Sequence, residues 1–560
     1  MAITWPLAPA GSLTYPDVPA GSIVAGAAAR YGDRTAFTHR GRELSFADVY
    51  RGACRFANAL RAHGFGPGDT IAIHLPNCLA YPVAYYGILL AGAAFTPANP
   101  LLPWPALAAQ LADSGAVAAV TFGRGAKALA DVKDQTRIRL VVVAEPDGEL
   151  TAGHQDFAEF HDNHPADPPE VVVDPRTALA HLAYTGGTTG RSKGVRLFHR
   201  NVVVNSLQYA CWGSGSVPVL DAEGNPVLDQ IGDEDEWPVR LGTGCMINLT
   251  PWFHAMGTIG GLNVPMLSGT TLVLHDRFDP PAYLAEAERR RVTSLGGAPA
   301  LFAALLACPD LATRDLSSVR TITSGAAPMP HEMLDALHRR FPGVVIAEGY
   351  GMTEVTMGAT QGPCARSATR KPGTVGLPVF DTEIKIVAAD GGEDPLPPGE
   401  RGEVCIRGPQ VMAGYHERPD ETAATLVDGW LHSGDIGILD ADGYLSIVDR
   451  KKDMLIYKGY NVYPRELEEL LMSQPGVASA AVVGRHRTDV GELPVAFVVR
   501  TPGANGLTEE ELTGAINEKV LPYQRLRELH FVDEIPVSAA GKILKRDLRA
   551  RLDSPLPTES

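Results

Sequence analysis

The chain of 560 residues is too long for one ordinary domain, and its 45% hydrophobic and 20% charged residues are typical of a globular protein with several compact units. Its formal charge of −16 argues against general nucleic-acid binding and against electrostatic attachment to anionic lipid, because both depend on clustered Lys and Arg. The 7 cysteines are dispersed and form no C-x-x-C pair, which favours reduced thiols over a disulfide framework or a zinc ribbon.

The N-terminal residues contain neither the basic region nor the apolar core of a secretory signal. The longest apolar runs, such as Ala80–Ala98, are interrupted by Pro and Gly and fall short of a clean membrane-spanning helix. We therefore expect a cytoplasmic protein with no integral membrane segment. The sequence leaves the oligomeric state open, a homodimer included.

The first part of the chain alternates between helical and strand patterns. Apolar residues at helical spacing predict a helix over residues 44–66, with Ser45 as its N-cap. Short apolar runs predict strands at 70–75, 117–121 and 138–143, and a second helix follows the first of these strands. This alternation predicts α/β layers built on largely parallel sheets.

The pattern changes after about residue 450, where shorter elements define a compact α+β unit. We expect an α/β protein with a large N-terminal domain of layered α/β subdomains over residues 1–451 and a small mobile C-terminal domain over residues 452–560. The helices of the small domain are predicted at 466–473 and 508–520, and its strands at 479–483 and 494–499.

Two further segments are strongly charged. Residues 213–238 are polar and acidic, which predicts an exposed insert and not a core element. Residues 449–453 read Asp-Arg-Lys-Lys-Asp and join the two predicted domains. A charged joint is typical of a hinge and equally of a solvated turn, and the local sequence does not decide between them.

The most informative segment is YTGGTTGRSKG, residues 184–194. Its glycines let the backbone approach phosphate oxygens, successive N–H groups can form an anion nest, Thr hydroxyls add donors, and Lys193 adds a positive charge. The spacing is not that of a Walker A loop. A flexible surface loop is the alternative, but two Thr and a Lys among the glycines favour phosphate binding.

Further short segments follow along nearly the whole chain: PWFHAMG (251–257), SGAAP (324–328), EGYGMTE (348–354), HSGD (432–435), DRKKD (449–453), YKGY (457–460) and GK (541–542). Together with the loop, they resemble the adenylate-forming superfamily, which includes acyl-CoA synthetases, stand-alone adenylation domains and beetle luciferase. The resemblance implies an AMP-forming acid–thiol ligase that uses ATP, Mg²⁺ and CoA.

The segment 348–354 also has a physical interpretation of its own. The ring of Tyr350 could stack on a flat base, the hydroxyl of Thr353 could donate to phosphate, and Glu354 is a hard oxygen ligand suited to Mg²⁺. A core turn with a capping Thr-Glu pair is the alternative from the residues alone. The resemblance implies Tyr350 on adenine, Thr353 on the α-phosphate and Glu354 on Mg²⁺.

The resemblance implies roles for further residues whose local sequence alone would fit a helix cap, a core histidine or a surface charge. Asp435 would accept both ribose hydroxyls. His254 would close the acyl end by positioning and not as a base, since the nucleophile is already a carboxylate. Lys542 would bridge the carboxylate and the α-phosphate, Lys452 would be the hinge, and Gly459 would line the pantetheine tunnel.

The implied binding residues form a long set that spans the phosphate loop, the adenine loop, the ribose site and the CoA side. They are Thr185, Gly186, Gly187, Thr188, Thr189, Gly190, Lys193, Gly325, Ala326, Ala327, Pro328, Glu348, Gly349, Tyr350, Gly351, Asp435, Arg450, Lys458 and Gly459. The phosphate loop departs from the family pattern twice. Gly186 stands where Ser is more frequent, and Ser192 stands where Pro is frequent.

The acyl pocket implied by the resemblance is rich in small residues and offers no carboxylate near His254 for an ammonium group. We therefore expect a medium- or long-chain fatty acid, although an aryl acid would also fit. The small residues are Gly257, Gly260, Gly261, Gly296, Gly297, Ala298 and Gly325.

The resemblance implies two steps. The acid and Mg·ATP form an acyl-adenylate and pyrophosphate; the C-terminal domain then turns about Lys452 and admits CoA, whose thiol takes the acyl group. The partners are thus small molecules. An amide synthetase or a ligase that loads a carrier protein shares the first step, and a nucleotide-binding regulatory protein without turnover is a third possibility. Five residues present together argue against the last: Thr353, Glu354, Asp435, Arg450 and Lys542.

Overall fold

The computed structural model of the chain describes residues 12–145, 148–185, 192–325, 327, 329–487, 489–504, 506–537 and 543–553. The chain divides into two compact units. Unit 1 comprises Met1–Thr185, Ser192–Glu383 and Ile406–Leu431, and unit 2 comprises Gly186–Arg191, Ile384–Cys405 and His432–Ser560. The boundary predicted at residue 452 therefore lies inside unit 2.

The longest sheet of unit 1 has the strand order β21-β9-β8-β4-β3-β5-β6-β7. Its strands pair in parallel from β8 to β7, which confirms the predicted parallel layers, while β9 and β21 add an antiparallel edge. The strands are β3 (Thr70–His74), β4 (Ala94–Pro97), β5 (Ala118–Phe122), β6 (Leu140–Ala144), β7 (His154–Asp156), β8 (Leu179–Tyr184), β9 (Gly194–Phe198) and β21 (Gly414–Tyr415).

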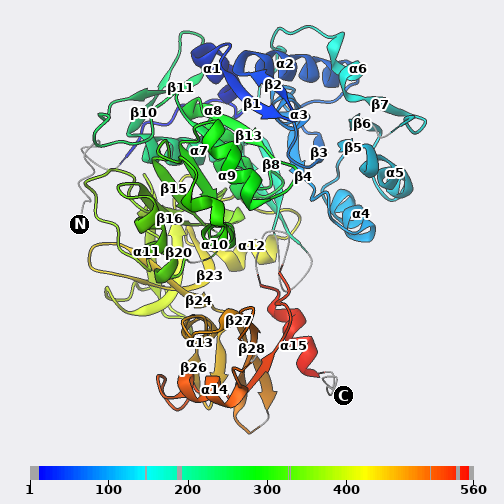
Figure 1. Cartoon of the computed structure of the whole chain (residues 1–560). Helices are drawn as coiled ribbons and strands as arrows, with labels where there is room; N and C mark the ends of the chain where they lie inside the picture. The colour runs from blue at the N-terminus through cyan, green and yellow to red at the C-terminus, as the bar shows by residue number, and fades with distance from the viewer. Residues whose placement is uncertain are drawn as a thin grey trace. The chain divides into compact units, whose positions relative to one another are not determined.

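The two predicted helices are present as α2 (Phe46–Ala62) and α3 (Ala80–Leu90), and they pack against each other (Figure 1). Ser45 caps α2 as predicted, because its side chain accepts the N–H of Asp48 and the Asp48 carboxylate accepts the N–H of Ser45. The apolar face of α2 buries Phe56 completely, which stabilises the fold by about 1.5–3 kcal/mol. None of the described helices is long and apolar enough to cross a bilayer.

Two smaller sheets complete the α/β layers of unit 1. One has the order β12-β13-β1-β2 and the other β14-β15-β16-β17-β18. In the second sheet β14, β15 and β16 are parallel, with Gly297, Ser324 and Glu348 in register near their carboxyl ends. Helices α9 (Pro280–Arg289), α10 (Pro299–Ala307) and α11 (His331–Arg340) contribute to the core beside these strands. The strands are β1 (Thr35–His39), β2 (Arg42–Ser45), β12 (Cys245–Asn248), β13 (Thr271–Leu274), β14 (Ser294–Gly297), β15 (Thr321–Ser324), β16 (Val345–Tyr350), β17 (Thr360–Gln361) and β18 (Leu377–Pro378).

The acidic stretch 213–238 is only partly the exposed insert that its composition predicts. It contains an antiparallel hairpin of β10 (Ser216–Leu220) and β11 (Pro226–Gln230), in which Leu228 is buried. Trp237 is also buried, against Gly215 and Gly232. The prediction is therefore wrong for the hairpin and Trp237, since apolar side chains anchor the stretch while most of its acidic side chains stay exposed.

Unit 2 confirms the predicted α+β composition of the C-terminal region. One sheet has the order β26-β25-β28-β27, with β29 beside β28, and another pairs β19, β20, β23 and β24. The strands are β19 (Glu383–Val387), β20 (Arg401–Arg407), β23 (Trp430–Leu439), β24 (Leu445–Arg450), β25 (Leu455–Tyr457), β26 (Tyr460–Val462), β27 (Val477–Arg487), β28 (Gly491–Arg500) and β29 (Glu528–Phe531). The helices are α13 (Pro464–Met472), α14 (Glu509–Asn517) and α15 (Lys545–Asp553).

A buried ion pair fixes α15 on this body. The Lys545 ammonium lies 2.8 Å from Glu468 Oε1 on α13, and both side chains are nearly inaccessible to water. Burial opposes the charged ammonium, yet the carboxylates of Glu468, Asp449 and Asp453 raise the pKa of Lys545. The same Glu468 oxygen accepts the N–H of Val482. The first residue of α15 is therefore tied to both α13 and β27.

We expect Lys545→Met to lower the free energy of unfolding by about 3–5 kcal/mol, because Glu468 would stay buried without its counter-charge. Urea titration followed by circular dichroism measures this loss. The double variant Glu468→Gln/Lys545→Met should recover most of it, since a Gln oxygen still accepts the Val482 N–H. If the single and double variants are equally unstable, the ion pair does not carry the effect.

Candidate active site

The ends of the predicted phosphate loop meet at the junction of β8 and β9. Thr185 N–H donates to the Lys193 carbonyl at 3.0 Å, Lys193 N–H donates to the Thr185 hydroxyl at 3.3 Å, and the Ser192 hydroxyl donates to the Thr185 carbonyl. Thr185 and Lys193 thus lie together, as predicted. The predicted residues between them, Gly186, Gly187, Thr188, Thr189 and Gly190, lie outside the described residues.

The segment 348–354 leaves the sheet at the end of β16. Gly349 and Tyr350 end the strand, and a single 3-10 turn carries Thr353 and Glu354. Gly351 is required here, because an added Cβ would lie 2.0 Å from the Met357 carbonyl oxygen. The predicted adenine, phosphate and metal residues therefore follow one another along a tightly packed turn.

The turn that carries Thr353 and Glu354 is also held by residues 410–412, which connect β20 to β21. Thr356 adopts a φ of 68°, and its hydroxyl donates to the Gln410 carbonyl at 2.7 Å. The Met412 N–H donates to the Glu354 carbonyl at 2.8 Å. Because Thr356 is completely buried, these bonds are shielded from water and hold the turn against residues 410–412.

Glu354, the predicted Mg²⁺ ligand, has one carboxylate oxygen that accepts a hydrogen bond. Tyr415 donates its hydroxyl to Glu354 Oε1 at 2.9 Å, and Oε2 has no hydrogen-bond or ion-pair partner among the described residues. Among the residues that the structure describes, no group of three or more His, Cys, Asp or Glu is placed to hold a metal ion. One carboxylate fits Mg²⁺ that takes its other ligands from phosphates and water.

The ammonium of Lys193 contacts the same tyrosine, Tyr415. It forms an ion pair with Glu421, and it lies 4.8 Å from the centre of the Tyr415 ring. Arg418 approaches the same Glu421 to 3.7 Å. Sequence analysis missed Tyr415 and Glu421, since neither belongs to a segment that carries the family resemblance.

The predicted adenine loop follows β15. Ser324 is buried, and its hydroxyl has no hydrogen-bond partner among the described residues. The Met329 N–H donates to Glu348 Oε2 at 2.9 Å. Glu348 therefore supports the far end of this loop from the neighbouring strand. Gly325 and Ala327 are described, whereas Ala326 and Pro328 lie outside the described residues.

His254 lies just before a π-helical segment, Met256–Asn263, a distortion that is frequent at functional sites. Its Nδ1 accepts the Met256 N–H at 3.4 Å, and its carbonyl accepts the Thr258 N–H at 2.9 Å. The imidazole is therefore oriented by the start of this segment. This arrangement suits the positioning role predicted for His254.

The glycines of the predicted acyl pocket have close neighbours. A Cβ on Gly260 would lie 2.9 Å from Met357 Sδ, and one on Gly257 would lie 1.9 Å from the Pro251 carbonyl oxygen. A Cβ on Gly325 would be 3.5 Å from Met256 Sδ. Packing thus requires Gly257, whereas flexible thioethers lie beside Gly260 and Gly325.

Unit 2 holds the predicted ribose and hinge residues. Asp435 on β23 and Arg450 on β24 are register partners, with Arg450 Nε 3.9 Å from Asp435 Oδ1. Burial, followed by the charge of Arg450, lowers the pKa of Lys452. Asp435, Arg450 and Lys452 therefore belong to one charged neighbourhood.

The residues predicted to lie on the CoA side, Lys458 and Gly459, form the turn of the β25–β26 hairpin. Lys458 and Gly459 have φ values of 50° and 82°, as a two-residue turn between paired Tyr457 and Tyr460 requires. An added Cβ on Gly459 would meet no atom within 4 Å, so the turn and not crowding explains this glycine. The predicted catalytic Lys542 lies outside the described residues.

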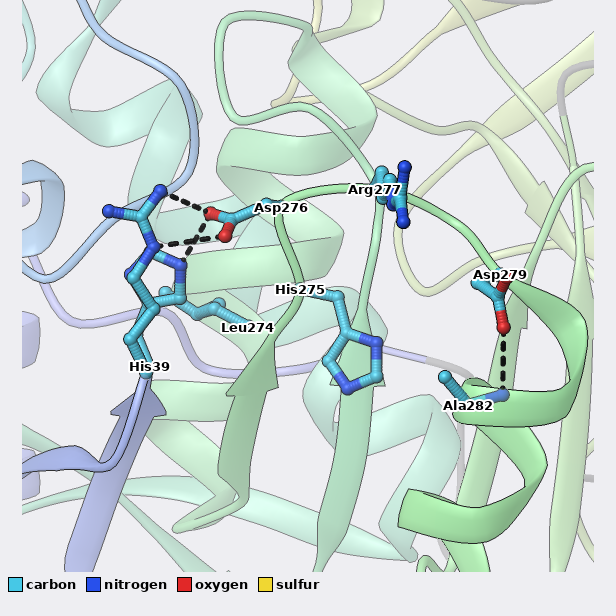
Figure 2. A pocket seen from close by; sticks show the side chains of 8 residues that line it. His39, Leu274, His275, Asp276, Arg277, Asp279 and Ala282 are labelled. Carbon is cyan, nitrogen blue, oxygen red and sulfur yellow. Dashed lines mark hydrogen bonds and ion pairs between the residues drawn. The ribbon is translucent and has the colours of Figure 1, made fainter.

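A separate surface pocket of about 480 Å³ contains none of the predicted site residues (Figure 2). Its central carboxylate, Asp276, accepts Arg40 Nε at 2.9 Å and lies 2.9 Å from His39 Nε2. The Arg40 guanidinium holds the pKa of Asp276 below its ordinary value. Asp279 caps α9 by accepting the Ala282 N–H at 3.0 Å. Its carboxylates are thus engaged in structural contacts, and we assign this pocket no substrate.

Residues 24–416 match the model of the AMP-binding enzyme family, and residues 466–542 match the AMP-binding enzyme C-terminal domain. The chain belongs to the AMP-binding enzyme family. The predicted hinge at Lys452 lies between the two matched ranges.

Individual proteins agree with this assignment over most of the chain. The chain is 36% identical to a feruloyl-CoA synthase of Amycolatopsis sp over 92% of its length and 96% of the relative. It is 33% identical to the long-chain-fatty-acid–CoA ligase of Bacillus subtilis (strain 168) over 96% and 95% of the two chains. The ATP-bound MatB of Rhodopseudomonas palustris superposes with a TM-score of 0.83 at 27% identity, covering 96% of this chain and 99% of MatB.

The family, the fold and these relatives define an ATP-dependent acyl-CoA ligase. Its small-molecule substrates are a carboxylic acid, ATP and CoA, and Mg²⁺ accompanies ATP. The α/β fold with a smaller C-terminal domain confirms the predicted fold class. The class leaves the acid to be identified.

We expect Gly351→Ala to reduce ATP-dependent pyrophosphate release by about 10²-fold, because the added methyl group displaces the turn that carries Thr353 and Glu354. Steady-state assays should locate the loss in adenylation, and circular dichroism should show a folded protein. Gly213→Ala is the matched control, since a Cβ there meets nothing within 4 Å. Equal activity of the two variants would contradict the tight packing of this turn.

Proposed function

We propose that this ligase activates an apolar monocarboxylic acid as its acyl-adenylate and transfers the acyl group to CoA. The observation that carries the proposal is that Lys193 and Glu354 both contact Tyr415 in unit 1, while Thr185 is hydrogen-bonded to the Lys193 backbone. A phosphate-loop cation and a metal-type carboxylate share one support there, which suits a bound triphosphate. We propose residues 1–451 and 452–560 as the domains of the catalytic cycle.

In the first step an oxygen of the substrate carboxylate attacks the α-phosphorus of ATP. The bond from that phosphorus to the bridging oxygen breaks, and pyrophosphate leaves. Bound Mg²⁺ supplies neutralisation of the phosphate charge, and Glu354 would hold it. Thr353 donates to the α-phosphate, Tyr350 stacks on the adenine, and Lys193 holds the outer phosphates.

In this proposal Lys542 bridges the carboxylate and the α-phosphate, which relieves the repulsion between two anions. The C-terminal domain then turns about Lys452, and the CoA thiol attacks the acyl carbonyl carbon. The bond from that carbon to the AMP oxygen breaks, AMP leaves, and the thiol proton passes to solvent. Asp435 accepts the ribose hydroxyls in this scheme, and Gly459 faces the pantetheine chain.

The acyl group that we propose first is a medium- or long-chain fatty acid. The apolar segment around Gly260 and Gly325, with Met256 and Met357 beside it, supports an apolar tail. An aryl-propenoic acid is the second candidate. It is supported by the 36% identity to a feruloyl-CoA synthase, which is slightly higher than the 33% identity to the fatty-acid ligase. The His254 segment has no carboxylate that could pair with an ammonium group. Neither candidate acid carries an ammonium group, so both are compatible with this segment.

A panel of acids separates these candidates. We expect pyrophosphate release with octanoic, palmitic, ferulic and 4-coumaric acids to differ by at least about 10-fold in kcat/KM between the preferred class and the other, since one buried methylene already changes binding by ~1–3 kcal/mol. A preference for the two aryl acids would overturn the fatty-acid proposal. Mass spectrometry of reactions with CoA or a simple amine identifies the acceptor, and an amide as the sole product would overturn transfer to CoA.

The role of Lys542 predicts an asymmetric loss. Removing one positioned charge costs about 10²–10³-fold in rate, so Lys542→Ala should lose that much in adenylate formation from acid and ATP. Supplied with pre-formed acyl-adenylate and CoA, the variant should make thioester at nearly the wild-type rate. A solvated surface lysine would give no loss in either assay, and a folding defect would give equal losses. A comparable drop in the second assay would refute domain alternation in this chain.

A further inference from the structure

The strand β21 brings one aromatic side chain to the edge of the phosphate loop. Gly414 and Tyr415 pair antiparallel with Arg196 and Val195 of β9, the strand that directly follows the loop. The Tyr415 N–H also donates to the Thr422 hydroxyl at 2.9 Å. The Tyr415 backbone is therefore held between α12 (Pro419–Thr425) and β9, the strand that begins directly after Lys193.

The Tyr415 side chain contacts two proposed substrate-binding groups at once. Its hydroxyl donates to Glu354 Oε1 at 2.9 Å, and its ring lies 4.8 Å from Lys193 Nζ. Only 8% of the residue is exposed. A tyrosine hydroxyl is an O–H donor at neutral pH, so this contact gives Glu354 one hydrogen bond from a nearly buried side chain.

Glu421 provides the negative partner of Lys193. The two side chains form an ion pair although both are more than one third exposed. Exposed pairs of this kind are weak, because water screens both charges. A triphosphate carries several negative charges and can therefore displace Glu421 from the ammonium.

A second set of contacts keeps Glu421 near the loop. Arg418 Nε lies 3.7 Å from Glu421, and Arg418 Nη2 lies 3.7 Å from Asp113. Asp113 in turn accepts the hydroxyl of Tyr184, the residue just before Thr185, at 2.6 Å. Residues on both sides of the loop thus belong to one connected set of polar contacts.

We propose that Tyr415 is a positioning residue that holds Glu354 and Lys193 in register for Mg·ATP, and that Glu421 is an exchangeable counter-ion that occupies Lys193 until the phosphates replace it. Tyr415 acts through Glu354 and Lys193 and does not react itself. This inference rests on the proposed function of that site. It assigns roles to two residues outside the segments that carry the family resemblance.

Tyr415→Phe tests the hydroxyl and keeps the ring under Lys193. Binding of a non-hydrolysable ATP analogue, measured by calorimetry at a series of Mg²⁺ concentrations, should require on the order of 10-fold more Mg²⁺, because a hydrogen bond to a charged group is lost. Tyr15→Phe is the matched control, since Tyr15 donates its hydroxyl to Asp381 at 2.7 Å and contacts neither Glu354 nor Lys193. An unchanged Mg²⁺ requirement in Tyr415→Phe, or an equal change in both variants, would overturn the positioning role.

Tyr415→Leu removes the ring as well. At saturating Mg²⁺ it should bind the analogue about 2–5-fold more weakly than Tyr415→Phe, which is the usual range for an exposed cation–π contact. Identical affinities of these two variants would show that the ring does not support Lys193.

Glu421→Gln tests the exchange. The analogue should bind about 2–5-fold more tightly at low salt, and the difference should vanish as salt rises, since an exposed ion pair is screened. Weaker binding in this variant would overturn the counter-ion role. If the wild-type protein binds no ATP analogue and releases no pyrophosphate with any acid, the proposed function has failed; if it does both and the three variants match it, this inference alone has failed.

Discussion

The mutual repulsion of anions is the constraint on which the proposed chemistry depends. A carboxylate has to reach a triphosphate on a protein whose own formal charge is −16. Two unit charges about 4 Å apart interact by ~4 kcal/mol near a protein surface, so a cation helps only if it is held in place. In our proposal the Tyr415 ring meets that condition for Lys193, while Glu421 pairs with the ammonium only until the phosphates replace it. In unit 2 the guanidinium of Arg450 likewise has an acidic neighbour, since its Nε lies 3.9 Å from Asp435 Oδ1.

Local apolar spacing determines how much of the fold could be predicted from the sequence. Helix α2 and strands β3, β5 and β6 follow from local apolar spacing, and Ser45 is visible as a cap in the sequence. The β10–β11 hairpin was not predictable in the same way. Its Leu228 is buried although acidic residues dominate the composition of the stretch, and partners distant in sequence, α1 (Ser22–Tyr31) and α8 (Val264–Ser268), contact β11.

The candidate site was predictable where its residues are contiguous. Glycine and threonine around Lys193 favour phosphate binding from the residues alone, whereas the run from Glu348 to Glu354 was assigned to phosphate and metal chemistry through the family resemblance. Tyr415 carries no such signal, because it lies 61 positions from Glu354 and reaches it only through the register of β21 with β9. Glu348 shows the converse limit, since the segment was predicted but not the bond of its carboxylate to the Met329 N–H.

The glycines near His254 show why the acid is harder to infer than the reaction. A glycine in the sequence suggests space, but the space beside Gly257 is filled by backbone and that beside Gly260 by Met357. What a ligand would meet there is a thioether, which is flexible and adapts to either an alkyl chain or a ring. The reaction depends on charges whose partners are specific in type and position. In the acyl pocket that we propose, the choice of acid would depend on the conformations of Met256 and Met357, which leaves the catalytic segments unchanged.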